Sequence, residues 1–140
     1  MPVVKEDCIF CKIANGQIPS NSIYEDENFN VILDVSPASK GHALILPKKH
    51  FDNAYHMDED VAKKVFPLAA KLACSMKEAL HCDGINILQN NEEAAGQTVF
   101  HFHMHLIPRY KDDDVDVTWK QHTSIDEEQK KITEQIKKYL

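Results

Sequence analysis

Long apolar runs are missing from this 140-residue sequence, in which no stretch approaches the roughly 20 apolar residues of a membrane-spanning helix. The N-terminal segment 1–7 is short and polar, unlike a secretion signal. Four cysteines without such a signal indicate a reducing compartment. We therefore expect a cytoplasmic protein that does not associate with membranes.

Positive charge is also scarce. Lysine and arginine number 16 against 22 aspartates and glutamates, which gives a net charge of −6. Because affinity for nucleic-acid phosphates comes largely from lysine and arginine, we expect no nucleic-acid partner. The G-x-x-x-x-G-K loop of kinases and NTPases is absent as well, and we predict no Mg²⁺ site. Any phosphate ester must therefore be held locally, by imidazoles, hydroxyls and backbone N–H groups.

Internal repeats, linkers and low-complexity segments are absent too. The chain is 43% hydrophobic and 27% charged, which suffices for one core and a charged surface. A chain of this length is of ordinary size for one domain. We therefore predict a single domain spanning residues 1–140.

The most informative stretch that is present runs from Phe100 to Pro108, where three histidines alternate with apolar residues. In an extended strand, side chains point alternately to the two faces. His101, His103 and His105 would then share one face, while the intervening apolar residues pack into a core. Imidazole suits proton transfer, nucleophilic attack and metal binding near neutral pH. Ordinary surface or core histidines and a histidine-rich metal tract are the alternatives.

The other segments predict a mixed α and β architecture. Asp7 is a suitable cap for a short helix over 8–15 that Gly16 ends, and Asp58 caps a long helix over 59–80 that Gly84 ends. Apolar residues recur along the long helix at helical spacing, with Pro67 expected to bend or split it. Further strands are predicted over 23–25, 29–33, 42–47 and 85–89.

The C-terminal part is predicted to be more exposed. The acidic run 112–116 is typical of a solvated loop. A capping box at Ser124–Glu127 opens a helix that runs to Leu140. Trp119 is either a core anchor or an aromatic wall near the site. Cys74 and Cys82 are expected to be inert packing residues.

Cys8 and Cys11 form a C-x-x-C pair, which is typical of a redox motif, of a metal site, or of two unconnected thiols. No βαβ pattern follows, which weakens the redox alternative. Together with His50 and His101 the two cysteines make a Cys₂His₂ set, the ligand set of a tetrahedral zinc site. Such a site would be structural, because four protein ligands leave no open position for a substrate.

The sequence His101-Phe102-His103-Met104-His105-Leu106-Ile107 matches the motif of the histidine triad (HIT) family at every position. Gly96-Gln97-Thr98 before it and Gly41-His42 with Pro47-Lys48-Lys49-His50 upstream are also similar to that family. The resemblance covers roughly residues 8–110, with 111–140 as a C-terminal extension. It implies an α+β fold with an antiparallel sheet of about five strands, a long central helix, and short N-terminal and C-terminal helices. It also implies a homodimer paired through edge elements and the long helix.

The resemblance further implies roles for individual residues. His103 would attack the α-phosphorus of a nucleotide, His105 would donate to phosphate oxygens, and Thr98 would contact the leaving group. The zinc-binding branch of the family carries metal ligands at the positions of Cys8, Cys11, His50 and His101, which implies one structural Zn²⁺ per chain. The implied nucleotide contacts are Asp34 at the ribose, Asn90, Gln97 and Thr98 at the ribose and phosphate, and Ile9, Phe10, Ile13, Ile32 and Leu33 around the base. Some members have glycine at the position of Ala95, and many have serine at that of Thr98.

The branch that this sequence resembles most cleaves a purine nucleoside 5′-monophosphate, adenosine or guanosine, from an amine. We therefore expect a hydrolase acting on nucleoside 5′-phosphoramidates through a nucleotidyl-histidine intermediate. A dinucleoside polyphosphate hydrolase of the same family is one alternative. A nucleotide-binding or zinc-dependent interaction protein with little catalysis is a second, and a metal-storage strand is a third.

Overall fold

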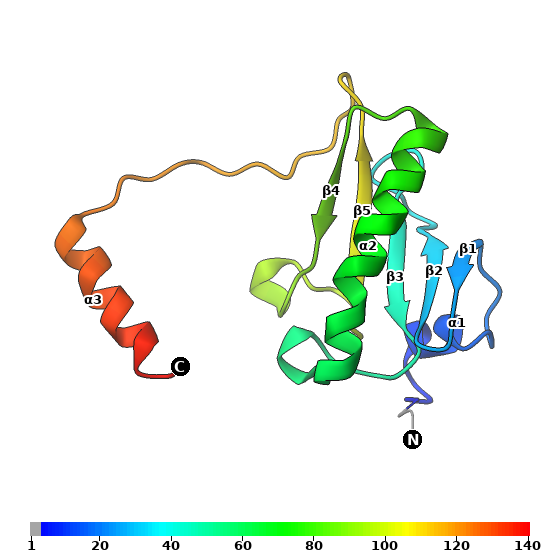
Figure 1. Cartoon of the computed structure of the whole chain (residues 1–140), viewed down its shortest axis with the longest axis horizontal. Coiled ribbons are helices and arrows are strands. Elements are labelled where there is room, and N and C mark those ends of the chain that lie inside the picture. Colours follow the sequence, from blue (N-terminus) through cyan, green and yellow to red (C-terminus); the bar gives the residue numbers. More distant parts are fainter. Residues whose placement is uncertain (1–3) are drawn as a thin grey trace.

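A five-stranded antiparallel sheet forms the centre of the fold in a computed structural model, which describes residues 4–140 (Figure 1). The strands lie in the order β1-β2-β3-β5-β4. Their bounds are β1 Ser22–Glu25, β2 Phe29–Leu33, β3 Ala43–Pro47, β4 Gly84–Leu88 and β5 Met104–Arg109. The helices are α1 Ile9–Ala14, α2 Glu59–Leu80 and α3 Asp126–Lys137, with 3₁₀ turns at Ala54–His56 and Glu93–Ala95. The predicted fold class is confirmed.

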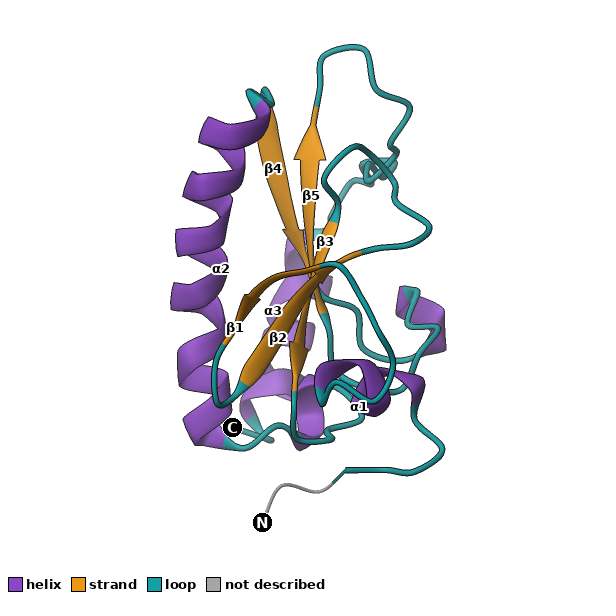
Figure 2. Ribbon diagram, turned by 90° about the vertical axis from the view of Figure 1, so that its right-hand side faces the viewer, coloured by secondary structure: helices purple, strands orange, loops and turns teal. Residues whose placement is uncertain are grey.

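The two faces of the sheet are covered by different helices. Helix α2 lies along one face and α1 lies against the other (Figure 2). The apolar stripe of α2 packs on the strands, and each fully buried large side chain contributes about 1.5–3 kcal/mol. The buried stripe consists of Val61, Val65, Leu68, Leu72 and Met76. On the other face, Phe10 and Ile13 of α1 pack near Ile32 and Leu44.

The histidine segment alternates as predicted, although the strand begins later than expected. Phe102, Met104 and Leu106 are buried in the core beneath α2. Strand β5 starts only at Met104, because the backbone N–H of Phe102 donates to the carbonyl oxygen of Phe51 (2.6 Å) rather than to β3. His101 and His103 therefore precede the strand proper.

Several predicted helix caps were wrong, although the predicted bounds of α2, 59–80, were right. Helix α1 is capped by Cys8, whose Sγ accepts from the N–H of Cys11 (3.3 Å), and not by Asp7. Helix α2 ends at His81 in the left-handed conformation (φ 53°), whereas Gly84 begins β4. Helix α3 follows Ile125 without a side-chain cap, so the capping box at Ser124 does not form.

Two further expectations about α2 also change. The helix continues through Pro67, because Pro67 and its lost hydrogen-bond partner Lys63 are both exposed, where water can satisfy the freed carbonyl. Cys74 is exposed rather than packed, while Cys82 is buried as expected. The predicted apolar stripe of α2 was therefore right at its buried positions, but it does not extend to Cys74.

The segment after β5 leaves the body of the protein, and α3 stands apart from it (Figure 1). Asp113 is not merely solvated as predicted, because both its carboxylate oxygens accept from Arg109 (2.9 and 3.0 Å). Trp119 is 82% exposed, so it is not a core anchor of this chain. Among residues 4–140, no helix is long and apolar enough to cross a membrane; residues 1–3 of the polar N-terminal segment lie outside the described range.

Candidate active site and metal centre

The metal centre joins α1 to the sheet. Helix α1 and its cap supply Cys8 and Cys11, while His50 follows β3 and His101 precedes β5. The four ligand atoms lie within 4.8 Å of one another. Both sulfurs lie 3.4 Å from Nδ1 of His101, and Cys11 Sγ lies 3.3 Å from Nδ1 of His50. Tetrahedral zinc with bonds of about 2.0–2.3 Å needs ligand separations of about this size.

The Nε2 atom of each imidazole in this centre, on the side away from the cysteines, also makes a hydrogen bond. Nε2 of His50 donates to a carboxylate oxygen of Asp52 (2.8 Å), and Nε2 of His101 donates to the carbonyl oxygen of Pro47 (2.9 Å). A proton on each Nε2 leaves Nδ1 with its lone pair directed at the cysteines. Such outer partners orient metal-binding histidines. The donor set therefore fits a zinc ion.

His103 lies next to this centre and its tautomer is fixed by the backbone. Its Nδ1 donates to the carbonyl oxygen of His101 (2.7 Å). Because a neutral imidazole carries one proton, Nε2 of His103 keeps a free lone pair. The phenyl ring of Phe10 packs edge-on against this imidazole at 5.0 Å, so α1 also positions His103.

His105 is oriented by His42, a histidine to which the sequence assigned no role. The N–H of Ala38 donates to Nδ1 of His42 (2.9 Å), which leaves the proton of His42 on Nε2. That N–H donates to Nδ1 of His105 (2.9 Å), with Asp34 Oδ2 at 3.7 Å from His42. His105 must then carry its own proton on Nε2, where it can donate to a ligand.

Burial keeps these imidazoles neutral. Burial, together with the neighbouring histidines, lowers the pKa of His101 and of His105 to about 4 each. It also lowers the pKa values of His103 and His42, although nearby Asp34 opposes this effect at both. At the metal centre, burial raises the pKa of the Cys11 thiol to about 11, so its conversion to thiolate requires a cation.

Small-molecule sites are typically cavities of about 300–1,000 Å³, and a cavity of about 480 Å³ opens beside His103 and His105. Two of the three triad imidazoles line it, while the third belongs to the metal centre. Its polar end is formed by Asp34, Thr98, His103 and His105. Its apolar end is formed by Phe10, Ile13, Ile32, Leu33 and Leu44. One wall thus offers imidazoles and a carboxylate, and the other suits a flat apolar ring.

Three residues that were predicted at the ligand do not line this cavity. Ile9 is 53% exposed and lines a neighbouring hollow with Thr98 and Val99. Gln97 is 2% exposed and uses its amide inside the protein, donating to the carbonyl oxygen of Asp52 (2.6 Å) and accepting from the N–H of Glu92 (2.8 Å). Asn90 packs beside Gly96 instead. The amide of Gln97 also donates to the carbonyl oxygen of Val99 (3.0 Å), so Gln97 holds the loop that carries Thr98.

His42 is the site residue to which sequence reasoning gave no role. It was placed in an apolar strand and in the Gly41-His42 part of the family resemblance, but a lone histidine gives no pairing signal. Its partner His105 lies 63 residues away, and only the register of β3 against β5, which places Leu44 opposite His105, brings them together.

The chain belongs to the HIT family, since a family profile described as "HIT domain" matches residues 15–112. It is 48% identical over 118 residues to "Protein hit" of Bacillus subtilis, covering 84% of this chain and 81% of that protein. It is 35% identical over 130 residues to the adenosine 5′-monophosphoramidase hnt1 of Schizosaccharomyces pombe, covering 92% of this chain and 95% of that one.

Solved structures agree with this assignment. A crystal structure of a protein from Streptococcus mutans is 44% identical, with a TM-score of 0.92, covering 96% of this chain and 86% of that one. A zinc-bound histidine triad family protein from Mycobacterium smegmatis is 38% identical, with a TM-score of 0.74, covering 83% of this chain and 84% of that one. The match with a zinc-bound relative agrees with the Cys₂His₂ cluster found here.

Replacing Cys11 by serine should empty the metal centre. Because metal binding is coupled to folding, the zinc content should fall from about one ion per chain to near zero and the Tm should drop. Elemental analysis and thermal unfolding measure both. Cys74→Ser is the matched control, since Cys74 is exposed on α2 and should change neither value. A Cys11→Ser protein that keeps its zinc and its Tm would contradict the assignment.

Proposed function

We propose that this chain is a hydrolase of purine nucleoside 5′-phosphoramidates that works through a nucleotidyl intermediate on His103. The observation that carries the proposal is the pair of fixed tautomers at one end of the cavity. His103 presents a lone pair on Nε2, while His105 presents an N–H on Nε2. A nucleophile and a hydrogen-bond donor therefore stand side by side, with ring centroids 5.0 Å apart.

The nucleoside part of the substrate fits the rest of the cavity. The base lies at the apolar end, between Phe10, Ile13 and Ile32. The carboxylate of Asp34 suits the ribose, because two acceptor oxygens match two vicinal hydroxyls. One oxygen of Asp34 already accepts from the N–H of Ser36 (2.8 Å), which fixes the orientation of the carboxylate. This arrangement directs the 5′-phosphate at His103.

The reaction proceeds in two displacements at phosphorus. In the first, Nε2 of His103 attacks, an N–P bond to the imidazole forms, and the N–P bond to the amine breaks. The leaving amine takes up a proton from solvent water, and Thr98 is placed to hydrogen-bond it. In the second, water attacks phosphorus, the bond from phosphorus to the imidazole breaks, and one proton of the attacking water returns to solvent. The nucleoside monophosphate is released and His103 is neutral again. His105 donates to phosphate oxygens in both steps as their negative charge increases.

The metal centre contributes structure rather than chemistry in this proposal. A zinc ion held by Cys8, Cys11, His50 and His101 would join α1 to the sheet and so keep Phe10 against His103. Zinc binding requires both cysteines as reduced thiolates, and all four cysteines of the chain are free. This requirement supports a reducing compartment, and we propose the cytoplasm as the site of action.

Replacing His103 by alanine should abolish turnover, because no other group can form the covalent intermediate, while nucleotide still binds the unchanged walls. The assay offers adenosine 5′-phosphoramidate and diadenosine tri- and tetraphosphate side by side, and the wild type should have the highest kcat/KM for the phosphoramidate. His122→Ala is the control, since His122 is exposed in the C-terminal extension.

The same assay separates the alternatives. A higher kcat/KM for the dinucleoside polyphosphates than for the phosphoramidate would identify this chain as a dinucleoside polyphosphate hydrolase. Nucleotide binding by the wild type without an adenylyl-His103 adduct, sought by mass spectrometry after acid quenching, would identify a binding protein instead. Full activity in His103→Ala would reject the mechanism.

Replacing His42 by leucine should weaken catalysis without touching the ligand. The change removes the N–H that fixes the tautomer of His105, so kcat/KM should fall by about 100-fold. His42→Gln keeps an N–H donor at a similar reach and should recover part of the loss. Steady-state kinetics with the phosphoramidate and a binding titration with AMP give the two readouts. Wild-type kcat/KM in His42→Leu would show that His105 needs no such partner.

A further inference from the structure

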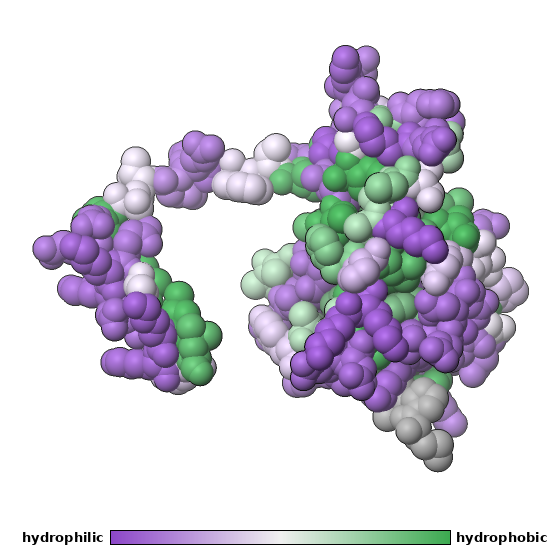
Figure 3. Space-filling view, in the orientation of Figure 1, coloured by the Kyte–Doolittle hydropathy of each residue, from purple (hydrophilic) through white to green (hydrophobic). Residues whose placement is uncertain are grey.

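Helix α3 has an apolar side that nothing in its own chain covers. Its exposed apolar residues form one stripe at helical spacing, namely Ile125, Ile132, Ile136 and, past the helix end, Tyr139 and Leu140. Within residues 4–140, α3 contacts none of the strands or other helices. In Figure 3 the stripe is the green band on the side of α3 that faces the body across open space. A 12-residue helix is marginal in water on its own, so this one requires a surface to pack against.

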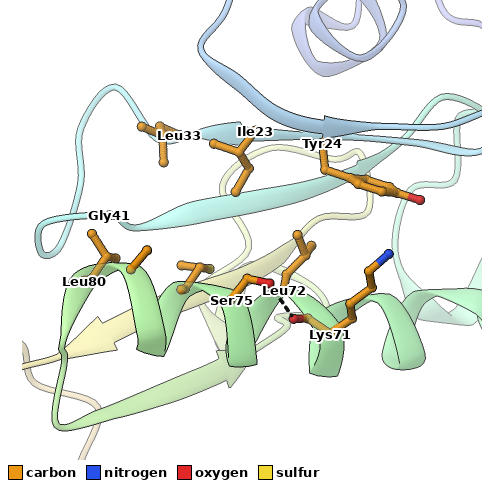
Figure 4. Close-up of a pocket in the computed structure, with 10 residues that line it drawn as sticks. Ile23, Tyr24, Leu33, Gly41, Lys71, Leu72, Ser75 and Leu80 are labelled. Carbon is orange, nitrogen blue, oxygen red and sulfur yellow. Dashed lines mark hydrogen bonds between the residues drawn. The ribbon is translucent and has the colours of Figure 1, made fainter.

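The body of the protein carries an unfilled apolar groove of about 440 Å³ on the α2 face. Leu72 and Leu80 of α2 rise toward Ile23 and Leu33 of the strands, and Gly41 lies beside the end of the helix (Figure 4). Met76 and Ala79 complete its apolar lining, and Lys71 and Ser75 form a polar rim. This face is separate from the nucleotide cavity, which lies on the α1 side of the sheet.

The dimensions of the stripe and the groove match. The residues of α2 that line the groove run from Lys71 to Leu80, which is about 13 Å at 1.5 Å per residue. The part of the stripe from Ile132 to Leu140 spans about 12 Å by the same rise. The end of α3 from Ile132, with the turn that follows it to Leu140, therefore has about the length of the groove.

The direction of the chain points away from the groove of the same molecule. The groove lies beside β1 and β2, at the edge of the sheet opposite β4. After β5, Arg109 donates to Asp113 and to the carbonyl oxygen of Val115, and the N–H of Lys111 donates to Asp83 just before β4. These bonds turn the segment toward the β4 edge, and Figure 1 shows it leaving there.

The extended arrangement recurs in a relative. The Streptococcus mutans crystal structure matches 96% of this chain with a TM-score of 0.92. The unmatched 4% is about six residues, far fewer than the segment 111–140, so the superposition includes the C-terminal segment in its detached position. A detached apolar helix that keeps its place in a second protein is held there by something outside its own chain.

We propose that α3 of one copy docks in the α2–β1 groove of a second copy, and that the exchange is reciprocal. The second copy sits beside the β4 edge, in the space between the body and α3. Reciprocal exchange buries both stripes and both grooves in a closed pair, which is the usual outcome of a two-fold interface. The occupant of the groove is thus the segment from Ile132 to Leu140 of the partner copy.

Site-specific disulfide trapping tests this proposal in the full chain with Cys74→Ser as background. One tagged copy carries Ser75→Cys or Ala79→Cys, and a differently tagged copy carries Ile132→Cys or Ile136→Cys. Coexpression and mild oxidation should link the two tags covalently in at least one pairing. Glu134→Cys, on the opposite side of α3, is the matched control and should not link. Linkage only within single chains, when both cysteines are in one copy, would show that α3 folds back on its own body and would overturn the proposal.

A second readout does not depend on disulfide geometry. In a protein whose α3 is unchanged, the thiol introduced by Ala79→Cys should react slowly with a maleimide. When Ile132→Gln and Ile136→Gln are added to that protein, the same thiol should react about tenfold faster. Lys130→Gln with Glu134→Gln is the control, because it leaves the net charge and the apolar stripe unchanged and should preserve protection. Sedimentation should give the wild type a mass of two chains. A single-chain mass, or a thiol that reacts equally fast in all three proteins, would also overturn the proposal.

Discussion

One residue, His101, connects the metal centre to the proposed nucleophile, and the geometry of the site depends on it. Its imidazole lies against both cysteine sulfurs, while its backbone carbonyl accepts from Nδ1 of His103 (2.7 Å). A change in the position of His101 therefore changes both the ligand set and the orientation of His103. Helix α1 adds a second connection, because it carries Cys11 on one side and Phe10, which packs against His103, on another. The Cys₂His₂ cluster and the cavity wall are therefore linked through both His101 and α1.

The tautomers of the other two triad members are determined by single backbone groups. The carbonyl of His101 fixes the proton of His103, and the N–H of Ala38 fixes that of His105 through His42. Because burial keeps all these imidazoles neutral, each ring has one donor and one acceptor, and the two roles cannot exchange. Two identical side chains therefore present a lone pair in one case and an N–H donor in the other, because of their surroundings.

Local patterns predicted the parts of this arrangement that depend on neighbours in sequence. The alternation from His101 to His105 placed Phe102 and Met104 in the core, and the apolar spacing of α2 identified its buried stripe. The pairing of His42 with His105 depends on strand register, and the inward use of the Gln97 amide depends on the Asp52 carbonyl, 45 residues away. Neither partner leaves a signal near the residue itself. Asp113 is a different case, because its partner Arg109 lies only four residues away, and the pair was overlooked within the acidic run.

The central claim is that Nε2 of His103 faces phosphorus in a bound nucleotide, and a crystal structure with AMP tests it most directly. The account predicts phosphorus about 3–3.5 Å from Nε2 of His103, the distance of a near-attack arrangement. It also predicts that Nε2 of His105 donates to a phosphate oxygen and that Asp34 accepts from the ribose hydroxyls. A phosphate bound away from both imidazoles, or a His103 whose Nε2 is turned from the cavity, would contradict it.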